Sequence, residues 1–222
     1  AFHFPKALEE TNNNELKIRQ AFGMNSTKVD IPFLSQNQEL VIEENVTIND
    51  IPIDEWNRYM GKNNILDYEG VKYLEKTFSN NPDQTNQWDF YYYTIKDSKG
   101  EVILMTFFTY GLWKDDMLAT ESVSRQLEEI RKTNPLYFTS KVVSMGCIFT
   151  EGNQCFINQD HPLAKKALKL LLDKLEEKYN ELNADSIVLR DFEEDNPWSK
   201  QIQDEGYFKI SMPESCVIQN PV

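Results

Sequence analysis

The pattern of apolar and polar positions is irregular over the first 37 residues and becomes regular after them. The early segment contains a polar run, ETNNNELK, and isolated apolar residues at Phe22, Val29, Ile31 and Phe33. A polar segment with isolated apolar residues is typical of an arm or linker that lies against a domain. We therefore predict two parts, an N-terminal arm or linker over residues 1–37 and a folded domain over residues 38–222.

Two apolar runs around a short turn form the clearest pattern of the domain. Residues 88–97, WDFYYYTIKD, and residues 101–113, EVILMTFFTYGLW, are rich in aromatic and β-branched side chains, and Ser98-Lys99-Gly100 separates them. This arrangement predicts a long antiparallel hairpin. Within the run at 91–93, successive tyrosine rings must point to opposite faces of the sheet.

The later part of the domain combines strand and helix patterns. Residues 136–149 are apolar at nearly every position, residues 162–183 carry an apolar stripe at helical spacing, and residues 184–192 have the pattern of a buried strand. A strand, a long helix and a second strand in this order require a parallel pair with a right-handed crossover.

The remaining patterns complete the order of elements. We expect a strand at 38–48, helices at 51–61, 66–78, 119–132 and 196–206, and a last strand at 207–213. In the helix at 119–132, Val123, Leu127 and Ile130 share one apolar side. The predicted fold class is α/β (α+β), with a single mixed, mostly antiparallel sheet and helices on both faces.

Composition and charge exclude several classes of protein. Hydrophobic residues make up 40% of the chain and aromatic residues 12%, which is ordinary for a globular protein and argues against disorder. The formal net charge of −13 argues against partners such as nucleic acid or anionic membrane, because both select basic surfaces. No apolar run approaches the roughly 20 residues that a membrane span needs.

The cysteines and the N-terminus bear on location and context. Cys147, Cys155 and Cys216 are odd in number and lack the spacing of a metal site, so we expect no metal and a reduced, cytoplasmic protein. Ala1 stands where an initiator methionine would be, and the arm follows it. Both observations favour a domain of a longer protein, and we expect fusion to an upstream enzyme domain as one arrangement.

This element order resembles that of the GNAT superfamily of acyl-CoA-dependent N-acyltransferases over residues 38–218. Within it, SMGCIFTEGNQCFI followed by a helix, ADSIVLRDF and DEGYFKI looks most like the divergent FemAB-like or predicted N-acyltransferase branch. The resemblance implies acyl-CoA, carrying an acetyl or longer group, as co-substrate and a small-molecule amine as acceptor.

The resemblance also implies a set of binding residues. In the family, the strand that matches KVVSMGCIF holds the pantetheine arm through its backbone, and the following turn and helix start hold the pyrophosphate. TEGNQC supplies only Gly152 of the family's glycine signature for phosphate. The positions carried over are Met145, Gly146, Cys147, Gly152, Asn153, Gln154, Lys165 and Lys166.

Lys165 and Lys166 lie in the first turn of the long predicted helix, where the positive end of the helix dipole disfavours basic residues. One explanation is that they contribute to a diphosphate site, since N–H groups at a helix start already favour an anion. The alternative is that they line a solvated helix face, because Ala164, Leu168 and Leu171 define the buried side.

Two carboxylates are candidate catalytic bases. Asp191 follows a buried strand at the edge where open α/β sheets bind ligands, and Glu151 follows the strand predicted to hold the acyl donor. The alternative for Asp191 is a solvated loop that precedes a helix capped by Asn196. Cys147 lies in an apolar strand with no histidine nearby in sequence, which favours structural burial over a nucleophilic role.

Three functions are compatible with these residues. The leading hypothesis is an N-acyltransferase that passes an acyl group from acyl-CoA, or from another acyl carrier, to an amine. The second is a non-catalytic domain of the same fold that binds a ligand or partner within a larger protein. The third is a FemAB-like transferase that takes an aminoacyl group from tRNA, although the acidic balance opposes it.

Overall fold

The computed structural model describes residues 2–3, 40–62, 66–150 and 152–211. Its strands are β1 (Phe2–His3), β2 (Val41–Asn45), β3 (Trp88–Lys96), β4 (Val102–Lys114), β5 (Thr139–Met145), β6 (Cys155–Ile157) and β7 (Ser186–Val188). Its helices are α2 (Ile53–Tyr59), α3 (Tyr68–Phe78), α4 (Glu121–Arg131), α5 (Ala164–Glu181) and α6 (Ser199–Asp204), with short 3-10 turns at Ile48–Asp50 and Gln84–Asn86. Of the predicted arm, only Phe2 and His3 fall within the described residues.

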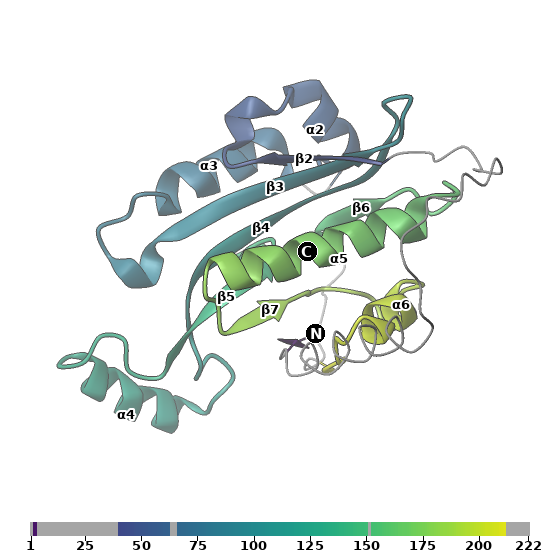
Figure 1. Ribbon diagram of the computed structural model, residues 1–222. Helices are drawn as coiled ribbons and strands as arrows, with labels where there is room; N and C mark the ends of the chain where they lie inside the picture. Colours follow the sequence, from purple (N-terminus) through teal and green to yellow (C-terminus); the bar gives the residue numbers. More distant parts are fainter. Residues whose placement is uncertain (1, 4–39, 63–65, 151, 212–222) are drawn as a thin grey trace, which may run out of the picture.

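The described strands form one mixed sheet, which confirms the predicted fold class (Figure 1). Its order is β1-β7-β5-β4-β3-β2, and β6 pairs with β4 off this path. The pairing of β5 with β7 is parallel and all the other strand pairs are antiparallel. Helix α5 connects the two parallel strands, as the crossover rule predicted.

The hairpin of β3 and β4 is the longest pairing in the sheet, running from Trp88 opposite Gly111 to Lys96 opposite Val102. Its turn is closed by the Asp97 carboxylate, whose Oδ1 accepts hydrogen bonds from the N–H groups of Lys99 at 2.8 Å and Glu101 at 2.9 Å. Gly100 has φ 83°, a conformation that glycine adopts without strain.

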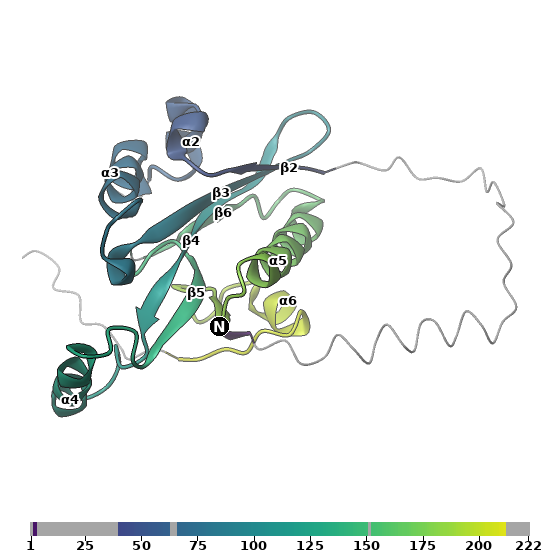
Figure 2. The ribbon, with the colours of Figure 1, turned by 60° about the vertical axis from the view of Figure 1, so that its left-hand side comes forward.

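Two apolar cores lie on opposite faces of the sheet. Tyr91 and Tyr93 point into the core beneath α5, and Tyr92 points into the core beneath α2 and α3, as strand alternation predicted. Figure 2 shows α2 and α3 on one side of the sheet and α5 and α6 on the other. Helix α5 contributes Leu168, Leu171 and Leu175, all fully buried or nearly so.

The second core covers only part of its face of the sheet. Its buried sheet residues come from β3 and β4, Phe156 of β6 packs against it, and among the described residues none comes from β5 or β7. In β5, Val143 and Met145 belong to the core beneath α5, so the alternating Ser140 and Val142 face the other way. Helices α2 and α3 do not cover this part of the face.

Three boundaries differ from the sequence prediction. The predicted strand at 136–149 ends at Met145, because Gly146 turns the chain with φ 63°. Cys155–Ile157 forms β6, which the sequence did not predict. Residues 207–211, predicted as the start of a last strand, are not a strand in the described part of the chain, and β1 occupies the edge beside β7 instead.

The helix predicted at 119–132 is present as α4, but its apolar side is not buried as a unit. Val123 is 45% exposed and Ile130 41%, whereas Arg131 is buried. The reason is a polar anchor: Arg131 donates to Asp116 Oδ1 at 2.6 Å and to the carbonyl oxygens of Tyr137 and Phe138, each at 2.9 Å. An ion pair therefore holds the segment between β4 and β5, which projects from the body in Figure 1.

Candidate functional site

The parallel pairing of β5 with β7 stops where the two strands reach their carboxyl ends. Ser144 opposite Val188 is the last pair. Beyond it, the N–H of Gly146 donates to the carbonyl of Phe107 in β4 at 2.8 Å, and the chain then makes a loop and returns to β4 as β6. Residues 146–154 therefore form a loop at the carboxyl end of β7.

A buried polar network fills the space beside this loop. Thr150 is fully buried and Gln154 is 1% exposed. The Thr150 hydroxyl contacts Gln154 Oε1 and accepts the N–H of Cys147 at 3.0 Å, and Gln154 Nε2 donates to the Thr150 carbonyl at 3.2 Å. Buried polar groups that satisfy one another in this way fix a local geometry.

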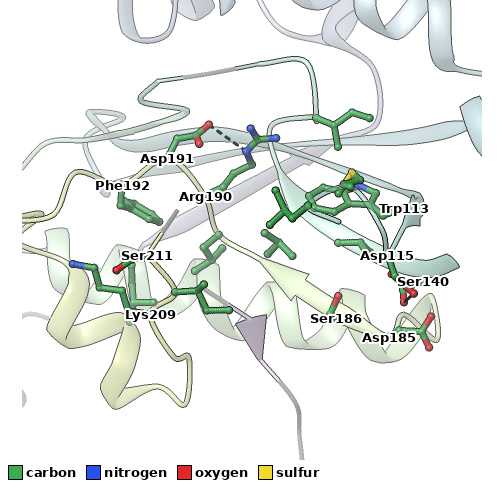
Figure 3. Close-up of a pocket in the computed structure, with 18 of the residues that line it drawn as sticks. Trp113, Asp115, Ser140, Asp185, Ser186, Arg190, Asp191, Phe192, Lys209 and Ser211 are labelled. Atoms are coloured by element: carbon green, nitrogen blue, oxygen red, sulfur yellow. Dashed lines mark hydrogen bonds and ion pairs between the residues drawn. The ribbon is translucent and has the colours of Figure 1, made fainter. Parts of the chain in front are cut away.

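The network reaches Asp191, which follows β7. Gln154 Nε2 donates to Asp191 Oδ2, and Arg190 Nε lies 3.2 Å from the same oxygen. Figure 3 shows the Arg190 guanidinium directed at the Asp191 carboxylate. Within the described residues, both contacts fall on Oδ2, so Oδ1 remains free to accept a hydrogen bond or a proton.

The backbone at Asp191 is in the left-handed region, with φ 62°. A residue other than glycine adopts this conformation at a cost of order 1 kcal/mol, and such residues concentrate at functional sites. Arg190 stabilises the neighbouring turn as well, because its Nη1 donates to the carbonyl of Cys147 at 2.8 Å. The strand end and the loop are thus joined through one arginine.

A groove of about 840 Å³ opens beside this network (Figure 3). It runs along β5 and β7, where Val142 and Val188 face away from α5, and it reaches α6, on the α5 side of the sheet, and the segment after α6. Its apolar lining includes Trp113, Val142, Val188, Leu189, Ile202 and Ile210. Arg190 and Asp191 line it at the carboxyl end of β7, and this volume lies in the range of small-molecule sites, roughly 300–1,000 Å³.

Four of the predicted site residues come together in this network: Gly146, Cys147, Gln154 and Asp191. Of the other loop positions, Gly152 is an open turn with φ 85°, and Asn153 Oδ1 accepts the N–H of Cys155 at 3.1 Å. The Met145 side chain is 2% exposed and packs in the core beneath α5. Glu151 lies outside the described residues.

The backbone donors at the end of β5 are already engaged. The N–H of Gly146 binds the Phe107 carbonyl, and the N–H of Cys147 binds the Thr150 hydroxyl. The resemblance predicted that this backbone holds a pantetheine arm. In this structure the two N–H groups serve the loop itself, so a ligand here would rely on side chains and on the groove.

Lys165 and Lys166 lie apart from the groove. Both are exposed on the first turn of α5, and neither lines the groove. Helix α6 stands between, because its Gln201 Nε2 donates to the Lys165 carbonyl at 2.7 Å while its Ser199, Ile202 and Gln203 line the groove. The site does not bring these lysines together with Asp191.

The two cysteines that the structure describes are buried. Burial raises the pKa of the Cys147 thiol, and burial also raises the pKa of the Cys155 thiol, to about 12. A thiol of raised pKa holds little thiolate at neutral pH and is a poor nucleophile. This placement agrees with the structural interpretation of Cys147.

A separate cluster of Asp97, Glu101 and His161 has side-chain ligand atoms within 4.8 Å of one another. His161 Nδ1 accepts the N–H of Leu163 at 3.2 Å just before α5, so the proton of the neutral ring sits on Nε2. That nitrogen lies 3.7 Å from Asp97 Oδ2. His161 therefore supports the start of α5 and also faces the carboxylates of Asp97 and Glu101.

Sequence reasoning missed Thr150, Arg190 and Trp113. Arg190 had a usable signal, because it is a single charged residue at the end of a buried strand and directly precedes a candidate base. Thr150 and Trp113 carried none, because their roles depend on a loop conformation and on an uncovered sheet face.

Comparisons with protein-family models, with curated proteins and with solved structures found no match. Among the described helices, none combines the length and apolar character that crossing a bilayer needs. The interpretation of the site therefore depends on its own geometry.

Proposed function

We propose that this chain is an N-acyltransferase domain that passes an acyl group from a thioester, with acyl-CoA as the donor, to the amine of a small molecule. The observation that carries the proposal is the position of Asp191. Its carboxylate lies where two parallel strands cease to pair, is held by Gln154 and Arg190, and borders a groove large enough for a small-molecule substrate.

In the proposed reaction, the amine nitrogen attacks the thioester carbonyl carbon and forms a C–N bond. The C–S bond then breaks, and the products are an amide and a free thiol. Asp191 Oδ1 accepts the proton that the amine nitrogen loses, and that proton passes to the departing thiolate. Gln154 and Arg190 hold Oδ2, so they fix the orientation of the carboxylate during the transfer.

A second candidate is a ligand-binding domain of this fold without catalysis. The engaged N–H groups of Gly146 and Cys147 favour it, because they leave the end of β5 without a free backbone donor for an acyl carbonyl. The two candidates differ in a measurable way, because only the first predicts turnover of an acyl donor.

The deciding experiment measures thiol release and amide formation. The protein is incubated with an acyl-CoA and a panel of primary amines, the released thiol is followed colorimetrically, and the amide is identified by mass spectrometry. We expect Asp191→Asn to lower the rate by about 10²-fold or more, in the range of a lost general base. Glu193→Gln, which changes a nearby exposed carboxylate outside the groove lining, is the matched control.

Each outcome separates the candidates. Turnover that Asp191→Asn removes and Glu193→Gln retains supports the proposal. Binding of the acyl-CoA without amide formation from any amine supports the ligand-binding domain. Turnover that is unchanged in Asp191→Asn would show that another group is the base.

A further inference from the structure

The groove has an apolar strip. Val142, Val188 and Leu189 underlie it but are only 3%, 6% and 2% exposed, so its accessible apolar surface comes from the side chains around them. That surface includes Met117, Leu118 and Ile210, which are 49%, 75% and 44% exposed, and the half-buried Trp113. These side chains come from β4, from the segment that follows β4 and from the segment after α6, so three parts of the chain supply apolar surface to one cavity.

Polar groups surround the apolar strip. Figure 3 shows Asp115, Ser140, Asp185 and Ser186 on one side of the groove, Lys209 and Ser211 on the opposite side, and Arg190 and Asp191 between them toward the top of the view. The polar groups on the first side already have partners: Asp115 Oδ2 accepts the Ser140 hydroxyl at 2.9 Å, and Asp185 Oδ2 accepts the N–H of Lys141 at 2.7 Å. Lys209, near α6, donates to the Glu194 carbonyl at 3.1 Å.

The distribution of apolar and polar residues in the lining indicates which kind of ligand fits the groove. An apolar strip favours a ligand whose middle is hydrocarbon, because burial of apolar surface on both sides drives binding. A peptide or a sugar would bring polar groups onto Met117, Leu118 and Ile210, where they would lose hydrogen bonds with water. An acetyl group would leave most of a groove of about 840 Å³ unused.

We propose that the groove takes a medium- or long-chain acyl group, with the thioester at Asp191 and the alkyl chain along the apolar strip. This inference rests on the proposed function, because it assigns the thioester to the position of Asp191. It adds a substrate class to that function: the donor is a fatty acyl thioester and the product is a fatty amide.

The test compares donors of different chain length on the same protein. Dissociation constants for CoA, acetyl-CoA, octanoyl-CoA and dodecanoyl-CoA are measured by isothermal titration calorimetry below the micelle concentration of each ester. We expect affinity to rise with chain length, with dodecanoyl-CoA binding on the order of 100-fold tighter than acetyl-CoA, because each buried methylene adds apolar contact.

Two matched variants locate the chain. Ile210→Glu places a charge in the groove lining, and Ile53→Glu places the same charge on α2, outside the lining. Both isoleucines are partly exposed, at 44% and 51%, so neither substitution threatens the core. We expect Ile210→Glu to reduce the dodecanoyl-CoA affinity toward that of acetyl-CoA, and Ile53→Glu to leave the chain-length dependence intact.

The outcomes distinguish this inference from the function on which it rests. If acetyl-CoA and dodecanoyl-CoA bind equally, or if both glutamate variants behave alike, the acyl-chain assignment is overturned while an acyl-CoA site remains. If no CoA ester binds at all, the proposed function fails and the acyl-chain assignment fails with it. Chain-length dependence that only Ile210→Glu removes establishes the groove as the acyl site.

Discussion

The side-chain amide of Gln154 lies where a Cβ on residue 146 would be. A Cβ built on Gly146 overlaps this amide and comes within 2.8 Å of Thr150 Oγ1. Gly146 also has φ 63°, in the left-handed region. Two features therefore require glycine at position 146: the left-handed backbone conformation, and the space that the Gln154 amide occupies between β5 and Asp191.

Gly146→Ala should destabilise the fold and displace Gln154 from Asp191. We expect a loss of roughly 2–4 kcal/mol in the free energy of unfolding, because backbone strain and steric overlap add. Chemical denaturation measures the loss. The matched control is Gly100→Ala, where φ is 83° but no heavy atom lies within 4 Å of the added Cβ. We expect that control to lose only about 1 kcal/mol. Equal losses would contradict the close packing of Gln154.

Arg131→Met should destabilise the protein by about 3–5 kcal/mol, the usual cost of breaking a buried ion pair. The Asp116 and Arg131 side chains are 6% and 5% exposed, and the substitution removes the Arg131 donors to the Asp116 carboxylate and to the Tyr137 and Phe138 carbonyls. Lys132→Met removes the exposed pair with Glu129 and should cost about 0–1 kcal/mol. Thermal melting compares the two variants. Similar melting temperatures would show that the Arg131 anchor contributes little.

Acid should weaken the same anchor. The hydrogen bond from Arg131 holds the pKa of Asp116 below its ordinary value of 3.8. A depressed folded-state pKa contributes stability that is present above pH 3.8 and is lost as the pH falls through the lower folded value. Stability curves from pH 6 to pH 2 should therefore show a smaller loss in Asp116→Asn than in the parent. Parallel curves would remove Asp116 as a source of acid sensitivity.

Replacing both Lys165 and Lys166 with Glu should leave ligand binding in the groove unchanged, because α6 stands between these lysines and the groove. The variant should gain about 0.3–1 kcal/mol of stability for each substitution, since the first turn of α5 holds no acidic residue and its dipole favours one. Calorimetric binding of an acyl-CoA together with a melting curve checks both parts. A large loss of affinity would instead assign the phosphates to the start of α5.

His161→Ala should cost about 1 kcal/mol, because the N–H of Leu163 loses its acceptor. His161→Asn should restore most of that loss, since an asparagine oxygen accepts the same kind of hydrogen bond. Added Zn²⁺ should not raise the melting temperature of the parent protein. A rise that His161→Ala abolishes would show that Asp97, Glu101 and His161 hold a metal after all.

The spacing of apolar residues along the sequence predicted most of the fold. Packing requires apolar residues at regular spacing on the buried side of each strand and helix. That spacing predicted the β3–β4 hairpin, the parallel β5–β7 pair and the helix α5 that connects the pair. The boundaries that failed depend on tertiary contacts. Gly146 stops β5 through a hydrogen bond to Phe107, and Val123 and Ile130 are exposed because Arg131, rather than an apolar residue, anchors α4.

The site was predictable only in part. Asp191 and the loop from Gly146 to Gln154 could be placed together because both follow strands that the crossover rule makes neighbours. The groove had no sequence signal, since it exists because α2 and α3 stop short of β5 and β7. Lys165 and Lys166 were adjacent to the loop in sequence, but α6 separates them from it in space.

The way the site loop joins the sheet has a consequence for how the protein could change. Gly146, directly after β5, bridges to Phe108, and Cys155 pairs with Thr106, so the two ends of the loop lie beside almost the same place on β4. A closed excursion of this kind can lengthen or shorten without shifting the register of any strand, and the entropic cost of extra residues grows slowly. A loop of different length or sequence could therefore be grafted between Gly146 and Cys155. We expect such a graft to change which side chains lie beside Asp191 and to leave the pairing of the strands unchanged.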